Sequence, residues 1–435
     1  MVPTRRFWLL VAMGIPVAIV AGATGGPLLL IAYNVTLVAI AWVTALMGPD
    51  PRRLAVVRTF DPVLSVRVPN KITVTIENTG AEPMQGLFRD EPPLDHQATQ
   101  RETRLRVEPG RESVFQYSIT PNTRGSDFFR GSFVRLDCPL GLVRKQAYLN
   151  TSQVVRVYPN VLALREFDLL KHKGKLDQIG IRKSRIKGLG TEFESLRDYA
   201  EGDDYRKIDW KATARRGKLV VRQFEQERNQ PVILVVDVGR KMLADVNGVS
   251  KLDHVLDASL MLSHAAMVSG DLVGLLVYSD TVRRYVPPRK GRNQAGVIVD
   301  AIHDLTAEPL ASSPQRAFSY LGRRWSRRAL IVLFTEVEDE DDARNLTAGL
   351  RQALRRHLTL VVRVADPDLL RSAAGRVESE EDLFQKAASL QFVNERQKAG
   401  SLLDAGGFHS LETEPQDLAA ALVSFYFQVK ERSLL

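Results

Sequence analysis

The feature that most constrains the fold is a change of pattern near residue 230. Beyond it, short apolar runs occur at 232–237, 272–278, 329–334 and 358–364. Stretches of helical pattern separate these runs, at 252–268, 295–305, 341–357 and from residue 416 onward. Apolar strands that alternate with helices are typical of a parallel sheet covered on both faces. We therefore predict an α/β domain with a Rossmann-like parallel sheet over residues 231–435.

The chain opens with two runs that contain no charged residue, 7–24 and 27–47. As helices they would measure about 27 and 31 Å, enough to cross a bilayer core of roughly 30 Å. Arg5 and Arg6 precede the pair, and Arg52 and Arg53 follow it. Because basic residues stay on the cytoplasmic side, residues 1–50 are predicted to form a two-pass hairpin whose soluble body is cytoplasmic.

A cleavable signal peptide is the alternative for the first run, because Ala21-Gly22-Ala23 resembles a cleavage site. The second run would then remain as an anchor. Its basic flank at Arg52 and Arg53 would still place the body in the cytoplasm.

Residues 54–160 alternate between apolar and polar positions, with Gly, Pro and Asn between the runs. This pattern predicts antiparallel strands, and about a hundred residues of it predict a small β-sandwich. The single cysteine, Cys138, excludes an intramolecular disulfide and a cysteine-rich zinc site. The net charge of +9 comes from residues 1–60 and from a basic connector at 161–187, which favours contact with anionic lipid over nucleic-acid binding.

Residues 188–227 combine nine acidic with eight basic residues and several aromatic rings. Balanced charges predict a network of Arg–carboxylate pairs, and rings among them predict a segment that covers a neighbouring core. A solvated charged linker is the alternative. Within the predicted linker and signature region, 161–230, we expect six residues to organise the network: Arg197, Asp203, Arg206, Asp209, Trp210 and Arg222.

The same segment carries a family resemblance. Gly-x-Glu-Phe-x-x-Leu-Arg-x-Tyr, followed by Gly-Asp-Asp-x-Arg-x-Ile-Asp-Trp-Lys-Ala-Thr-Ala-Arg, covers residues 190–215. It closely resembles the signature of the bacterial "domain of unknown function 58" family. The resemblance implies a protein of the bacterial inner membrane with a von Willebrand A-like domain, often paired with a MoxR-type AAA+ ATPase. Residues 231–435 also resemble a von Willebrand A domain.

Two carboxylates follow predicted strands at the edge where α/β sheets bind ligands, Asp237 and Glu336. The von Willebrand A resemblance implies a magnesium site there, but Gly239 and Lys241 stand where two hydroxyls are expected. An ammonium among oxygen ligands repels a cation. We therefore expect Lys241 to pair with Asp237 at an edge without cofactor, and Asp237 and Glu336 remain the only candidate metal ligands.

Catalytic patterns receive little support. The seven histidines form no His-x-x-x-His pair, and the basic runs at 323–328 and 355–356 are interpreted as solvated helix ends. Our main hypothesis is a non-enzymatic, membrane-anchored adaptor that presents a von Willebrand A-like surface to a MoxR-type AAA+ ATPase. The alternatives are a metal-dependent membrane-associated hydrolase that uses Asp237 and Glu336, and an envelope protein that binds lipid or polysaccharide through the β-sandwich.

Overall fold

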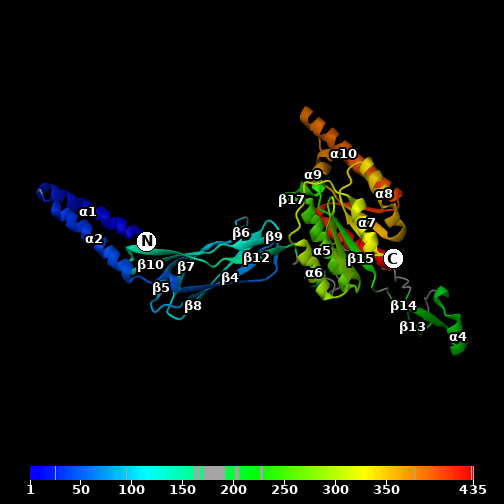
Figure 1. Cartoon of the computed structure of the whole chain (residues 1–435), viewed down its shortest axis with the longest axis horizontal. Helices are drawn as coiled ribbons and strands as arrows, with labels where there is room; N and C mark the ends of the chain where they lie inside the picture. Colours follow the sequence, from blue (N-terminus) through cyan, green and yellow to red (C-terminus); the bar gives the residue numbers. More distant parts are fainter. Residues whose placement is uncertain are drawn as a thin grey trace. The chain divides into compact units, whose positions relative to one another are not determined.

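A computed structural model describes residues 1–24, 26–94, 96–160, 164, 167–169, 192–200, 205–225, 229–377, 379–432 and 434. The chain divides into two compact units, Met1–Tyr158 and Pro159–Leu435. Figure 1 shows the elements of each unit.

Two apolar helices begin the first unit, α1 (Arg5–Thr24) and α2 (Pro27–Met47). They pack against each other, and the Tyr33 hydroxyl of α2 donates to the Leu10 carbonyl of α1 at 2.5 Å. Both are long and apolar enough to cross a membrane, a property that signal sequences and core helices can share. Large apolar side chains remain exposed along both, including Trp8, Leu28 and Trp42.

The rest of the first unit is β-structure in three sheets, with orders β1-β11-β10-β5-β7, β2-β4-β8-β6 and β3-β12-β9. All pairs are antiparallel except β3 with β12. The strands are β1 (Val2–Pro3), β2 (Leu54–Phe60), β3 (Leu64–Ser65), β4 (Asn70–Asn78), β5 (Met84–Asp90), β6 (His96–Ala98), β7 (Glu102–Val107), β8 (Glu112–Pro121), β9 (Gly125–Phe129), β10 (Ser132–Asp137), β11 (Val143–Leu149) and β12 (Gln153–Tyr158). Alternate residues of β4 and β5 are buried, as the period-two pattern predicts.

These sheets share one core, which contains a buried ion pair. Arg58 donates to both oxygens of Asp90, at 3.0 and 2.5 Å. The Tyr117 and Ser132 hydroxyls also donate to Asp90, at 2.6 and 2.9 Å. The guanidinium lies 4.4 Å from the centre of the Phe129 ring. Because every buried polar group of this cluster is paired, it joins the sheets rather than forming a reactive site.

A six-stranded sheet organises the second unit, in the order β19-β18-β15-β20-β21-β22. Five strands are parallel: β15 (Pro231–Asp237), β18 (Leu272–Tyr278), β20 (Leu330–Phe334), β21 (Leu358–Val364) and β22 (His409–Thr413). The edge strand β19 (Val282–Arg289) is antiparallel and was not predicted. It contains Pro287 and Pro288. Proline has no backbone N–H to donate, and an edge strand tolerates this because one of its sides has no neighbouring strand.

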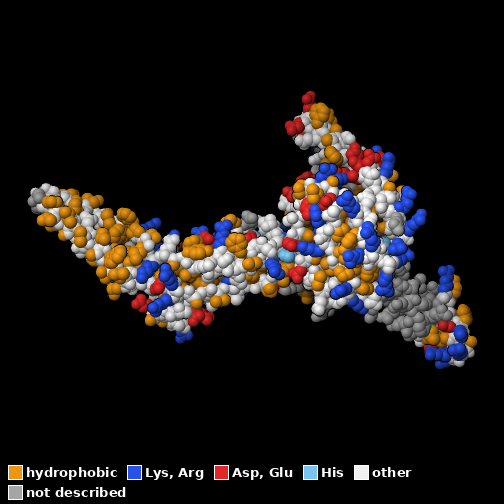
Figure 2. Space-filling model, in the orientation of Figure 1, with side chains coloured by type: hydrophobic (Ala, Val, Ile, Leu, Met, Phe, Trp, Pro, Cys, Tyr) orange, Lys and Arg blue, Asp and Glu red, His pale blue; other side chains and the backbone are white. Residues whose placement is uncertain are grey.

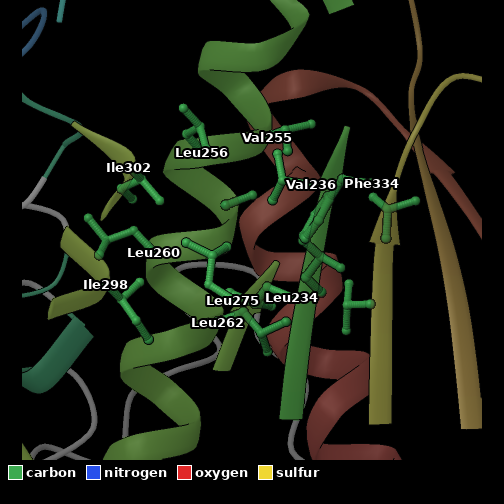
Figure 3. Packing of buried hydrophobic residues seen from close by; sticks show 14 of the residues in the cluster. Leu234, Val236, Val255, Leu256, Leu260, Leu262, Leu275, Ile298, Ile302 and Phe334 are labelled. Atoms are coloured by element: carbon green, nitrogen blue, oxygen red, sulfur yellow. The ribbon is translucent and has the colours of Figure 1, made fainter. Parts of the chain in front are cut away.

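Helices cover both faces of this sheet. α5 (Lys251–Val268), α6 (Arg292–Ile302) and α11 (Pro415–Glu431) share one core with the strands (Figures 1 and 3). α7 (Pro314–Arg324), α8 (Glu340–Arg356) and the C-terminal half of α10 (Glu380–Ala405) share the other, and α9 (Pro367–Ala374) packs on α10. Val232, Leu234 and Val236 face the first core while Ile233 and Val235 face the second, which is why these strands are continuously apolar.

A hairpin forms most of the described part of the charged signature. β13 (Glu192–Asp198) pairs with β14 (Val220–Glu225), and between them lie a 3₁₀ turn, Tyr205–Lys207, and α4 (Trp210–Arg216). Gly217 ends α4 in the left-handed conformation, at φ 66°, which favours glycine. The predicted basic connector, 161–187, lies outside the described residues except for 164 and 167–169.

Candidate functional site at the carboxyl edge of the sheet

Asp237 is the last residue of β15, and only 2% of it is exposed. Its carboxylate accepts hydrogen bonds from the Gly239 amide at 2.8 Å, the Thr335 hydroxyl at 2.7 Å and the Ser312 hydroxyl. Thr335 directly follows β20, which pairs with β15, and Ser312 lies in the loop before α7. The topology therefore gathers three distant segments at the carboxyl ends of two adjacent parallel strands.

Gly239 is explained by its close approach to Ser312. A Cβ atom at position 239 would lie 2.0 Å from the Ser312 Oγ and 2.8 Å from the Leu310 carbonyl oxygen. The Ser312 hydroxyl thus occupies the space that a side chain at 239 would need. The resemblance implied a hydroxyl at position 239, in the turn after β15. In this protein Ser312, in the loop before α7, supplies the hydroxyl instead.

Burial dominates the electrostatics of Asp237. It raises the pKa of the carboxyl, and the hydrogen bonds from Ser312, Thr335 and Gly239 offset part of that effect. The fully buried phenol of Tyr278 also has a raised pKa, first because of burial and then because Asp237 is nearby. The surroundings of Asp237 therefore stabilise it mainly through neutral donors.

The prediction that Lys241 pairs with Asp237 is wrong. The Lys241 ammonium forms ion pairs with Asp342, in the first turn of α8, and with Glu338 at 3.5 Å. Burial lowers the pKa of Lys241, but the two carboxylates more than offset this and raise it. Three acidic residues begin α8, and one of them, Asp342, pairs with the lysine that the sequence suggested for Asp237.

Glu336, the second candidate metal ligand, is engaged by donors within the protein. Its Oε1 accepts the Val364 amide at 3.0 Å, and its Oε2 lies 3.0 Å from the Lys251 ammonium and 2.8 Å from the Arg396 guanidinium. Both carboxylate oxygens are thus engaged by donors from α5, α10 and β21. Burial would raise the pKa of Glu336, but Lys251 and Arg396 together hold it below its usual value.

The Glu336 ion pairs continue into a larger buried network. Arg396 also donates to Glu412 at 2.6 Å, and Arg363 lies 2.8 Å from the other oxygen of Glu412. Arg396 additionally donates to the Val364 carbonyl at 3.2 Å. Because these residues come from α10, β21 and β22, the network fixes the C-terminal half of α10 to the sheet.

Whether this edge can bind a metal ion depends on the oxygen ligands that its residues offer. Asp237, Ser312 and Thr335 offer one carboxylate and two hydroxyls, and both hydroxyls already donate to that carboxylate. Calcium takes six to eight oxygen ligands and magnesium needs near-ideal octahedral geometry. With Glu336 held by two cations and the Lys241 ammonium on the same wall, the described residues do not fit a conventional magnesium site.

A cavity of about 260 Å³ opens at this edge, beside Asp237. Its wall includes Lys241 and Asp342, which pair with each other, and the amide side chains of Gln315 and Asn345. Lys241 and Asp342 neutralise each other within the wall, and the Arg240 side chain also lines the cavity. This arrangement suits structural support or a polar protein contact better than activation of a substrate.

A different kind of surface lies on the N-terminal half of α10. Phe384 is 74% exposed and Phe392 56%, and Leu383 and Leu390 are exposed as well. We call these four residues the α10 apolar surface. Exposed Glu380 and Glu381 precede it, and Figure 2 shows hydrophobic and acidic side chains together at the projecting end of the helix.

The residues that were predicted to organise the charged signature have different surroundings in the structure. Asp209 caps α4 and accepts the Lys211 and Ala212 amides, each at 3.0 Å. Arg206 lies over the Tyr205 ring at 5.9 Å, and Arg197 donates to the Asp198 carbonyl at 3.2 Å. Asp203 lies outside the described residues, as does the side chain of Arg222, whose backbone belongs to β14.

Trp210 does not bury its ring as expected. It is 67% exposed, because it opens a short helix in which no residue is buried. The neighbouring Tyr205 ring is 68% exposed. The Trp210 and Tyr205 rings therefore lie on the surface of this segment rather than in a core.

Sequence reasoning missed the residues that complete this edge. Ser312 and Thr335 are common residue types 75 and 98 positions from Asp237, so only their placement reveals them. One usable signal was the position of Thr335 directly after an apolar strand. Lys251 and Arg396 gave no comparable signal, because each lies within a helix rather than beside a strand end.

A sequence profile described as "Protein of unknown function DUF58" matches residues 195–382. Residues 195–382 are a DUF58 region. Relatives include "Uncharacterized protein Rv1480" of Mycobacterium tuberculosis, 29% identical over 209 residues, and "Uncharacterized protein YeaD" of Bacillus subtilis, 24% identical over 165 residues. These matches cover 47% and 38% of this chain, and 65% and 39% of the two relatives. The family prediction is thereby confirmed.

Two solved structures resemble parts of this chain. BatB from Bacteroides thetaiotaomicron is 13% identical, with a TM-score of 0.31 over 46% of this chain and 98% of BatB. The CARDB domain of PF1109 from Pyrococcus furiosus is 17% identical, with a TM-score of 0.19 over 25% of this chain and 89% of that domain. Both TM-scores are too low to define the fold.

Proposed function

We propose that this protein is a non-enzymatic adaptor anchored in the bacterial inner membrane, with its soluble units in the cytoplasm. Its second unit would be a von Willebrand A-like domain that presents a binding surface to another protein. The partner we propose is a MoxR-type AAA+ ATPase, in keeping with the family resemblance. The pair would act in the assembly or remodelling of protein complexes.

Membrane anchoring is supported by the exposed apolar faces of α1 and α2. Leu28 is 78% exposed and Leu9 66%, although the two helices pack against each other. Burying a large apolar side chain is worth roughly 1.5–3 kcal/mol, so such a surface favours lipid over water. The arginines at both ends of the hairpin support a cytoplasmic location for the soluble units.

The von Willebrand A-like interpretation is supported by the arrangement at Asp237. An aspartate ends the first strand of a largely parallel sheet, and hydroxyls from two other loops surround it. A residue from each of three loops at the carboxyl edge is the arrangement that the resemblance implies. Here the hydroxyls stabilise the carboxylate directly, which supports a structural edge without a cofactor.

The observation that carries the proposal is the α10 apolar surface. Phe384 and Phe392 expose most of their rings on a helix whose other half is anchored by the Glu336 network. Aromatic residues are enriched among the residues that contribute most to protein–protein binding. Because Glu380 and Glu381 flank this surface, the partner is expected to offer an apolar groove with a basic rim.

Binding of the full-length protein in detergent to a purified MoxR-type ATPase of the same organism tests this proposal. The double variant Phe384→Ser/Phe392→Ser should weaken binding by at least about tenfold, since each such contact is worth more than about 1 kcal/mol. The control is Val297→Ser on α6, where the side chain is 48% exposed. Equal binding by all three proteins would contradict the proposed surface, and so would equal losses in both variants.

A further inference from the structure

A second cavity, of about 370 Å³, lies between α7 and α8. Its volume falls within the roughly 300–1,000 Å³ that is typical of small-molecule sites. Phe318 and Leu350 give it an apolar wall, and Ser319 adds a hydroxyl. None of the functions considered above uses this space.

Small residues on the two helices keep the cavity open. A Cβ atom at Gly322 would meet nothing within 4 Å, so the space in front of it is empty. At Gly349, a Cβ atom would lie 2.5 Å from the Gln315 side chain, which shows that the helices approach closely there. The gap beside Gly322 is thus a local opening in an otherwise close-packed pair of helices.

The charge around this cavity is positive and uncompensated. Arg323 lies in the last turn of α7 and Arg356 ends α8, and both line the cavity. Neither guanidinium forms an ion pair with any residue that the structure describes. Guanidinium groups recognise phosphate and carboxylate through paired N–H donors, and unpaired ones remain free to do so.

His357 adds a polar group to the same wall. It is only 7% exposed, and its Nδ1 has no hydrogen-bond partner among the described residues. Burial, followed by the charges of Arg356 and Arg328, lowers the pKa of His357 to about 4. The neighbouring cations therefore act on this ring without a carboxylate to balance them.

We propose that this cavity binds a small organic oxyanion. Arg323 and Arg356 pair with its phosphate or carboxylate, and its apolar body lies against Phe318 and Leu350. Basic residues at the ends of helices are ordinarily explained by the helix dipole. That explanation accounts for the arginines but not for the open space and the unpartnered histidine beside them.

Phenyl phosphate is a suitable probe, because it joins a phosphate to an apolar ring. Its binding to the full-length protein in detergent is measured by calorimetry, with inorganic phosphate and benzyl alcohol as comparisons. We expect saturable binding of phenyl phosphate that weakens with added salt, and weaker binding of each comparison compound. No saturable binding of phenyl phosphate at millimolar concentration would overturn the proposal.

Matched variants separate this site from general surface charge. Arg323→Gln/Arg356→Gln should weaken binding at least tenfold, and Arg324→Gln/Arg355→Gln should change it less than twofold. The two double variants remove equal charge from the same helix ends, but residues 324 and 355 do not line the cavity. Gly322→Met should abolish binding by filling the open space, without a clash to unfold the protein. Equal losses in the two arginine pairs, or full binding by Gly322→Met, would overturn the proposal.

Discussion

The carboxyl edge of the sheet and the N-terminal half of α10 lie in the same unit but differ in how their side chains are satisfied. At the edge, Asp237 and Glu336 are buried, and donors within the protein engage both carboxylates. On α10, Phe384 and Phe392 extend into solvent without comparable cover. A ligand at the edge would have to replace existing bonds, whereas a partner on α10 would bury surface that is now exposed.

The edge itself contains a second contrast. Neutral hydroxyls and an amide stabilise Asp237, while two cations stabilise Glu336. Burial therefore leaves the pKa of Asp237 raised, whereas Lys251 and Arg396 lower that of Glu336. The two carboxylates should thus respond differently to substitution and to pH.

Glu336→Gln should have the largest effect. Removing one partner of a buried ion pair costs about 3–5 kcal/mol, because the remaining charges are left buried without compensation. Chemical denaturation of the soluble fragment 54–435 at pH 7 measures the loss. The control is Glu338→Gln, whose side chain is half exposed and which should change stability by less than about 0.5 kcal/mol. Similar losses for the two variants would contradict the structural role of the network.

The stabilisation by Glu336 should also depend on pH. Its folded pKa lies below the unfolded value, so its contribution is present above pH 4.5 and is lost as the pH falls through the folded pKa. The difference between wild type and Glu336→Gln should therefore shrink in acid. A difference that grows as the pH falls would contradict the ion-paired state of Glu336.

Asp237→Asn should have a smaller effect, of about 1–2 kcal/mol, since one hydrogen-bonding oxygen is retained and no buried cation loses its partner. Its pH dependence should have the opposite sign. The folded pKa of Asp237 lies above its unfolded value, so wild type should lose stability relative to the variant as the pH rises from 3.8 until Asp237 is ionised. Denaturation across this range measures the stability difference between wild type and the variant. If this difference changed with pH in the same direction for Asp237 and Glu336, the contrast between the two carboxylates would be contradicted.

Magnesium should leave the melting temperature unchanged. A bound ligand stabilises the folded state according to its affinity, so a cation that finds no site gives no shift. Thermal melting of fragment 54–435 with millimolar magnesium chloride, and with potassium chloride of equal ionic strength, makes the comparison. A rise with magnesium that Asp237→Ala removes would show that the edge binds the ion.

Trp210→Ala should have the smallest effect on stability. The ring is 67% exposed, and exposed substitutions usually change stability by less than about 0.5 kcal/mol. Thermal melting of fragment 54–435 checks this result. A loss of about 3–5 kcal/mol would mean that the ring is buried in a core, as the sequence suggested.

The fold of the second unit could be predicted where the chain is uniformly apolar. β18 and β21 begin and end at the predicted residues, since strands buried on both faces are continuous apolar runs. α10 was not predicted, because one part of it packs on the sheet and the other does not, so its apolar residues follow no single stripe. β22 was missed as well, because four of its five residues are charged or polar.

The site was less predictable than the fold. The position of Asp237 after a strand was sufficient to place it at the edge, but its partners depend on loops that the sequence does not align. Lys241 was assigned the wrong partner because several carboxylates lie nearby, and the cations that pair with Glu336 come from helices far from it in the sequence. Which of them meet is decided by how α5, α8 and α10 pack.

Site-specific photo-crosslinking in living cells tests most directly whether the α10 apolar surface binds the proposed partner. A photoreactive phenylalanine derivative replaces Phe384 in the full-length protein, and in a control protein it replaces Val297. The account predicts an adduct with a MoxR-type AAA+ ATPase at position 384 and none at position 297. The absence of any protein adduct at 384, or the same adducts at both positions, would contradict it.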